Sequence, residues 1–142
     1  MVSVAVNRGA GVSLVHLYLM RALYLLIGVG MGMQVWPAIL HHARHWDLWH
    51  GVAVAMLGAL TVLCLVGVRY PVRMLPLLFF EFAWKLIWML AVWLPLYLAH
   101  AVDADTAENL PAILMGVVLV PLVLPWGYVW KHYVVAPSDR WK

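Results

Sequence analysis

Residues 74–99 read MLPLLFFEFAWKLIWMLAVWLPLYLA. This run is longer than the roughly 20 apolar residues that a helix needs to cross the hydrocarbon core of a bilayer. Its apolar residues are continuous and do not alternate with polar ones, which argues against a strand of a membrane barrel. Backbone groups inside lipid must be hydrogen-bonded internally, and a helix achieves this by itself. We therefore predict that residues 74–99 cross a membrane as one helix.

Three further apolar runs, residues 14–40, 48–68 and 111–130, meet the same requirement, and Pro121 and Pro125 predict a bend in the last one. The chain is 66% hydrophobic and 11% charged, whereas soluble domains carry about a quarter charged residues. The sequence therefore predicts an all-α integral membrane protein, a single four-transmembrane-helix bundle with short loops. In size and topology alone it resembles the small four-helix bacterial inner-membrane proteins, among them the DoxX-like proteins.

An even number of spans places both chain ends on the same side of the membrane. The basic residues expected on that side are Arg8, Arg21, Arg69, Arg73, Lys131, Arg140 and Lys142. The opposite side holds Arg44 together with Asp47, Asp103, Asp105 and Glu108. Because basic residues favour the cytoplasmic side, we predict a multi-pass protein of the bacterial inner membrane with both termini in the cytoplasm. The cations form no basic stripe, so we expect no nucleic-acid partner.

The run 74–99 contains two charged residues, Glu81 and Lys85. They are four apart on one helix face, with the acid on the favourable N-terminal side. Lys85 lies roughly 18 Å along the helix from Arg73, which places it near the middle of the bilayer. A lone charge at that depth costs about 2.5–3.5 kcal/mol or more, so both groups should face the bundle interior. Counting from the outer aromatic residues puts Arg21 at a similar depth, which predicts a buried Arg21–Glu81–Lys85 network.

This network has two interpretations, and the sequence does not separate them. The charges can be structural and hold the first and third helices together. They can also form a functional polar pocket that binds an amphipathic ligand or carries protons, because charged residues inside membranes often mark such sites. Trp84 and Trp88 lie one turn apart beside the charges. They either flank the pocket or pack as ordinary apolar side chains.

Small residues recur at helical spacing in the first two spans. Gly28 and Gly32 are four residues apart, as are Gly51 and Ala55. Such residues let two helices approach closely in lipid, where van der Waals contact drives helix association. They predict either packing between the first two spans of one chain or a homodimer through one of these two faces.

Histidines gather around the expected outer loops: His41, His42, His45, His50 and His100. Imidazoles are common ligands of zinc, copper and haem iron, so this cluster is a candidate metal or haem site. No second pair at fixed spacing completes a zinc signature. The alternative is a polar interfacial loop whose histidines titrate near pH 6–7.

These features favour a non-enzymatic membrane protein, with no predicted catalytic residue. The leading hypothesis is a bundle that binds a hydrophobic or lipid-like ligand, with membrane lipid as its partner, or an accessory subunit of a larger membrane complex. The first alternative is a small proton-linked transporter that uses Glu81 and Lys85. The second is a metal- or haem-dependent membrane enzyme or electron carrier that uses the outer histidines.

Overall fold

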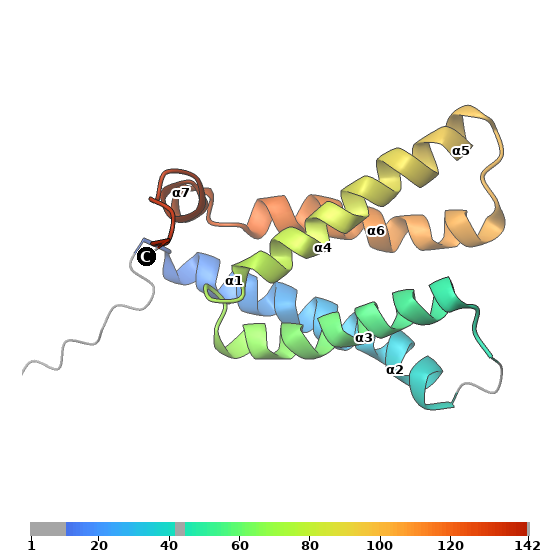
Figure 1. Ribbon diagram of the computed structural model, residues 1–142, viewed down its shortest axis with the longest axis horizontal. Helices are drawn as coiled ribbons and strands as arrows, with labels where there is room; N and C mark the ends of the chain where they lie inside the picture. Colours follow the sequence, from blue (N-terminus) through green and yellow to red (C-terminus); the bar gives the residue numbers. More distant parts are fainter. Residues whose placement is uncertain (1–10, 42–44, 142) are drawn as a thin grey trace, which may run out of the picture.

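The computed structural model describes residues 11–41 and 45–141. Helices build two antiparallel hairpins that lie side by side (Figure 1). The first hairpin consists of α1 (Leu14–Leu25), the π-helical turn η1 (Leu26–Met31), α2 (Gly32–His41) and α3 (Leu48–Arg69). The second consists of α4 (Leu75–Trp88), the π-helical turn η2 (Met89–Trp93), α5 (Leu94–Leu98) and α6 (Ala104–Val123). A short helix follows, made of α7 (Trp126–Val129) and η3 (Trp130–Val134).

Four continuous helices are long and apolar enough to cross a membrane: Leu14–His41, Leu48–Arg69, Leu75–Leu98 and Ala104–Val123. In the described part of the chain all regular secondary structure is helical. The prediction of an all-α chain with four such helices is therefore confirmed, and these helices suggest a multi-pass membrane protein. The first three helices begin and end within one residue of the predicted bounds.

Three of these helices begin at a side chain that accepts a backbone hydrogen bond. Ser13, Asp47 and Asp103 accept from the backbone N–H of the residue three positions later, His16, His50 and Thr106 respectively. Such caps satisfy amide groups that have no partner within the helix. They fix where α1, α3 and α6 start.

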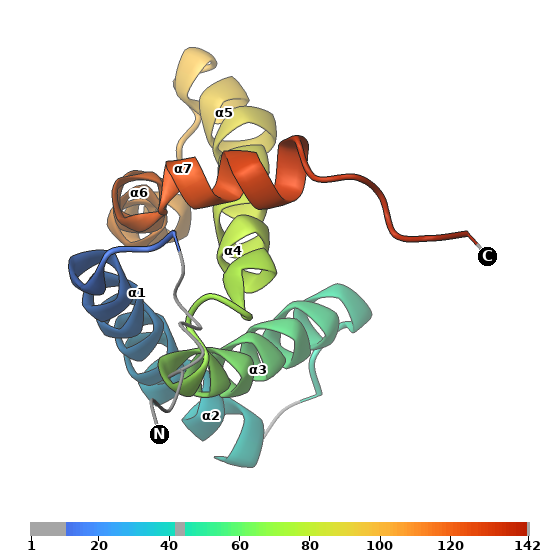
Figure 2. The same ribbon diagram turned by 90° about the vertical axis from the view of Figure 1, so that its left-hand side faces the viewer.

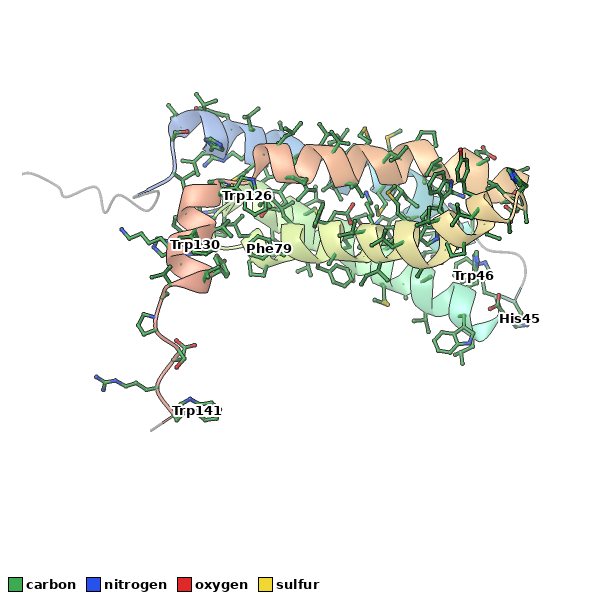
Figure 3. All side chains as sticks on the ribbon, turned by 90° about the horizontal axis from the view of Figure 1, so that it is seen from above. His45, Trp46, Phe79, Trp126, Trp130 and Trp141 are labelled. Carbon is green, nitrogen blue, oxygen red and sulfur yellow. The ribbon has the colours of Figure 1, made fainter. Side chains whose placement is uncertain are left out.

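The predicted fourth span, residues 111–130, is wrong in its bounds, because α6 covers Ala104–Val123. Asp103 caps the helix, which begins at Ala104, seven residues before the predicted start at Pro111. Pro111 itself lies inside the helix. Leu124 is extended, with ψ 132°, because a residue that precedes a proline is biased away from the helical region. Pro125 therefore ends the span instead of bending it. The following helix, α7–η3, runs across the end of the bundle (Figures 2 and 3).

The bundle is tight at one end and open at the other. We call the end with Ser13, the α3–α4 connection and α7 the terminal end, and the end with the two other connections the distal end. The core lies toward the terminal end and includes Met20, Leu23, Tyr24, Ile27, Leu60, Cys64, Leu75, Leu78, Val120, Val123 and Leu124. At the distal end η2 and α5 contain no buried residue, and the hairpins diverge there (Figure 1).

Glycines bring the first hairpin together. A Cβ at Gly28 would lie 3.2 Å from the backbone oxygen of Thr61, and one at Gly58 would lie 2.8 Å from Ile39. Gly32 is also buried and faces Thr61. The Gly28/Gly32 face thus packs against α3 within the chain. A homodimer through Gly51 and Ala55 stays a prediction.

Candidate functional site

The candidate site is the ion pair between Glu81 and Lys85 on α4. Both residues are turned into the bundle, and their exposed fractions are 0% and 6%. The Lys85 ammonium contacts Glu81 Oε1 one turn earlier on the same helix. The prediction that these two charges are buried and paired with each other is therefore confirmed.

Trp84 completes the environment of the carboxylate. Its indole Nε1 donates a hydrogen bond of 2.7 Å to Glu81 Oε2, and its ring lies 5.6 Å from the Lys85 ammonium. Each carboxylate oxygen thus has a partner, one cationic and one neutral. Because all three side chains come from one turn of α4, this arrangement needs no other helix to form it.

Gly116 on α6 supplies the space that Lys85 occupies. A Cβ at this position would lie 2.6 Å from Lys85 Cδ and 3.0 Å from Cε, which is too close for real carbon atoms. The long side chain of Lys85 therefore lies directly against the backbone of α6. Gly116 is not among the residues predicted from the sequence, although it interrupts the apolar run of the fourth span.

Arg21 does not join the pair. Its Nε donates a 3.1 Å hydrogen bond to the Val68 carbonyl, in the last turn of α3, where carbonyls lack helical partners and favour a cation. Its guanidinium also lies 5.7 Å from the centre of the Tyr18 ring. Within residues 11–41 and 45–141 no ion pair links Arg21 to Glu81, so this part of the predicted network is not formed. Arg21 contacts the end of α3, whereas Glu81 lines a cavity with Leu23 and Ile27, which follow Arg21 on the first helix.

A cavity of about 210 Å³ lies beside the pair, between the first helix, α4 and α6. Glu81, Lys85 and Gln34 are its polar residues. The π-helical turn η1 supplies part of the wall, as such turns often do at functional sites. The apolar wall is formed by Leu23, Leu26, Ile27, Gly30, Met31, Ala112, Met115, Gly116 and Leu119. Leu26, Gly30 and Met115 are exposed on the side of the bundle, so we call this space the lateral cavity.

A second cavity of about 350 Å³ lies toward the distal end, and Lys85 and Gln34 border it as well. Asp105, Thr106 and Asn109 give this distal cavity a polar wall at the start of α6. Trp84 and Trp88 line it from α4. The polar residues of α6 were not predicted as site residues, because the predicted fourth span begins after them. Gln34, the single glutamine of the chain, was not predicted either.

The structure does not bring the predicted histidine set together. His42 lies outside the described residues, and His41, His45, His50 and His100 are exposed. The α5–α6 connection, which contains His100, lies apart from the α2–α3 connection in both views (Figures 1 and 2). Figure 3 labels His45 and Trp46 on the latter. In the described part of the chain no three His, Cys, Asp or Glu residues are grouped to hold a metal ion. The metal or haem site stays a prediction.

Comparison of the chain with protein-family models, curated proteins and solved structures finds no match. A proposal for the function therefore rests on the geometry of the site. Chemically, the pair offers an ammonium donor and a carboxylate acceptor at the wall of an apolar cavity. It can bind a polar group there or exchange a proton.

Proposed function

We propose that the protein binds an amphipathic, lipid-like molecule inside its bundle. The polar head of the ligand contacts Lys85 and Glu81, and its apolar part occupies the lateral cavity. One observation carries the proposal: a buried ion pair forms the polar wall of a cavity whose other residues are almost all apolar. The exposed rim at Leu26, Gly30 and Met115 gives such a molecule an entry from the surrounding lipid.

The chemistry of the pair limits the head group. The ion pair is neutral as a unit, and a further net charge at this depth would be costly. The favoured head group is therefore uncharged and carries a hydroxyl or a carbonyl oxygen, which can accept a hydrogen bond from the Lys85 ammonium. The cavity of about 210 Å³ is smaller than the roughly 300–1,000 Å³ of common ligand pockets. The cavity would therefore hold the head group and the first part of the ligand's hydrocarbon chain. The rest of that hydrocarbon chain would extend out through the rim.

Native mass spectrometry of the full chain in a gentle detergent tests this proposal. Gly30→Leu is the test variant, because Gly30 lines the rim of the cavity and a Cβ there has no neighbour within 4 Å. Gly127→Leu is the matched control, since Gly127 is equally open but lies outside the four long helices. We expect the parent and Gly127→Leu to retain a lipid-like mass that Gly30→Leu loses, with similar melting temperatures for all three. Equal retention by both variants would refute the proposal.

A larger complex in the same spectra would favour the accessory-subunit hypothesis. If no preparation of the protein carried a ligand or a partner, both hypotheses would be contradicted.

We further propose that the chain lies in a bacterial inner membrane with both termini in the cytoplasm. The described cations at the terminal end support this orientation, because basic residues favour the cytoplasmic side; they are Arg21, Arg69, Arg73, Lys131 and Arg140. Single cysteines in a Cys64→Ala background test it through labelling of intact cells with a membrane-impermeant maleimide. Ala107→Cys at the distal end should react and Ser138→Cys at the terminal end should not. The reverse pattern would invert the topology.

A second candidate function, proton-linked transport, has support from the distal cavity. That cavity joins Lys85 to polar residues at the start of α6, which gives the ion pair a polar route toward one end of the bundle. Proteoliposomes that contain a pH-sensitive dye provide the test. Transport predicts proton movement that Glu81→Gln abolishes, and no movement with the parent would exclude it.

A further inference from the structure

A second polar cavity lies at the terminal end, away from the Glu81–Lys85 pair. It has a volume of about 360 Å³ and lies between α1, the end of α3 and the α3–α4 connection. The residues that line it are Leu17, Arg21, Arg69, Tyr70, Pro71, Val72 and Arg73. Three of these seven residues are arginines and none is acidic. We call this space the arginine cavity.

Local contacts hold the arginines around this cavity. Arg69 and Arg73 flank Tyr70 in the sequence, and their guanidinium carbons lie 5.5 Å and 5.7 Å from the centre of its ring. The hydrogen bond from Arg21 to the Val68 carbonyl anchors the third guanidinium.

The connection itself is fixed to α1. Tyr24 donates a 2.9 Å hydrogen bond to the Pro71 carbonyl, and Tyr24 is fully buried. The α3–α4 connection is therefore positioned by the core, and its two arginines are presented on a defined backbone.

The charge of this cavity is not balanced within the described residues. Their one ion pair joins Lys85 to Glu81, so no carboxylate in the described part of the chain pairs with Arg21, Arg69 or Arg73. Three like charges around one space repel each other and attract an anion. Guanidinium groups match the geometry of phosphate oxygens through paired N–H donors. Arg21 uses one N–H on Val68, which leaves its terminal nitrogens for such contacts.

We propose that the arginine cavity binds a phosphate group. The group can come from the headgroup of an anionic phospholipid or from free phosphate. Basic pockets between helices at the membrane surface recognise phosphorylated headgroups through this chemistry. The apolar Leu17 and Val72 in the wall suit a headgroup whose chains continue along the helices. The proposal does not depend on the ligand of the lateral cavity.

The experiment uses full-length, delipidated protein in detergent and phosphate-free buffer. One arm titrates inorganic phosphate, and the other titrates phosphatidic acid; binding is followed by native mass spectrometry and by ³¹P NMR. Binding of the lipid alone identifies a headgroup site, and comparable binding in both arms identifies a phosphate-ion site. Either result supports the proposal. Absence of binding in both arms would overturn it.

Arginine variants separate a built site from general charge attraction. Arg69 and Arg73 are exposed, so Arg69→Gln and Arg73→Gln should fold and melt like the parent. Since a basic residue near a membrane surface contributes about 1 kcal/mol to binding an anionic lipid, each variant should bind about fivefold more weakly. Lys131→Gln and Arg140→Gln remove a charge outside the cavity and should leave binding unchanged. If the controls weaken binding as much as the cavity variants, the site does not exist.

Discussion

The contact between Lys85 and Gly116 makes Gly116→Ala the sharpest test of the site. The added Cβ would lie 2.6 Å from Lys85 Cδ and 3.0 Å from Cε. The end of a lysine can normally move away, but this one is 6% exposed and is held by Glu81. Moving it would separate a buried ion pair, and we therefore expect the variant to destabilise the bundle.

The magnitude follows from two opposing terms. Glycine to alanine in a helix interior normally stabilises by about 0.5–1 kcal/mol. A buried charge that loses its partner costs about 3–5 kcal/mol. The net expectation for Gly116→Ala is a loss of about 2–4 kcal/mol in the free energy of unfolding.

Reversible unfolding in mixed detergent micelles, followed by far-UV circular dichroism, measures this free energy. Gly30→Ala is the matched control, because a Cβ at Gly30 meets no atom within 4 Å; it should be neutral or slightly stabilising. In a Glu81→Gln, Lys85→Ala background the clash and the ion pair are both absent, so Gly116→Ala should be tolerated. If Gly116→Ala and Gly30→Ala unfold alike in the parent background, the reasoning about Lys85 is refuted.

Three further predictions concern other contacts. Glu81→Gln leaves Lys85 buried beside a neutral group and should cost about 3–5 kcal/mol, while Glu81→Gln with Lys85→Met should cost clearly less; equal losses in chemical unfolding would contradict this. Gly67→Ala places a Cβ 2.6 Å from the buried ring of Tyr24 and should lower the melting temperature, whereas a parent-like melt would show that the ring moves freely. At Asp103 a backbone N–H donates to the carboxylate and lowers its pKa, so the cap stabilises α6 fully above the ordinary pKa of about 4 and weakens as the pH falls through the lowered value. Asp103→Asn should remove that acid sensitivity in hydrogen exchange of the first turn of α6, and an unchanged pH profile would count against it.

The number and type of spans could be predicted because they depend on length and composition alone. Continuous apolar runs allow few alternatives in lipid, so the first three helices match their predicted bounds closely. The fourth does not, because the apolar run and the helix are different segments. Asp103 caps a polar first turn that hydropathy assigns to a loop, and Pro125 ends a helix whose apolar pattern continues to Trp130.

In the candidate site, too, the sequence predicts local contacts but not contacts that depend on how the helices pack. The Glu81–Lys85 contact is local, set by a spacing of four on one helix, and the sequence therefore indicates it. The hydrogen bond from Trp84 depends on its rotamer, and the place of Arg21 depends on how α1 packs against the end of α3 within the first hairpin. Gly116 acquires its role only when α6 is placed against α4. The spacing of residues along one helix does not predict which residue of another helix it will contact.

The helix α7–η3 has a consequence for access to the ion pair. Figure 2 looks onto the terminal end and shows this helix crossing in front of α6 and α4. Its Tyr133 packs edge-on against Phe79 of α4, with ring centres 5.1 Å apart. The two cavities that border Lys85 instead face the flank of the bundle and its distal mouth. In this conformation the ion pair therefore borders space at the flank and toward the distal end. Access to the charges from the terminal end would require the C-terminal helix to move away from Phe79.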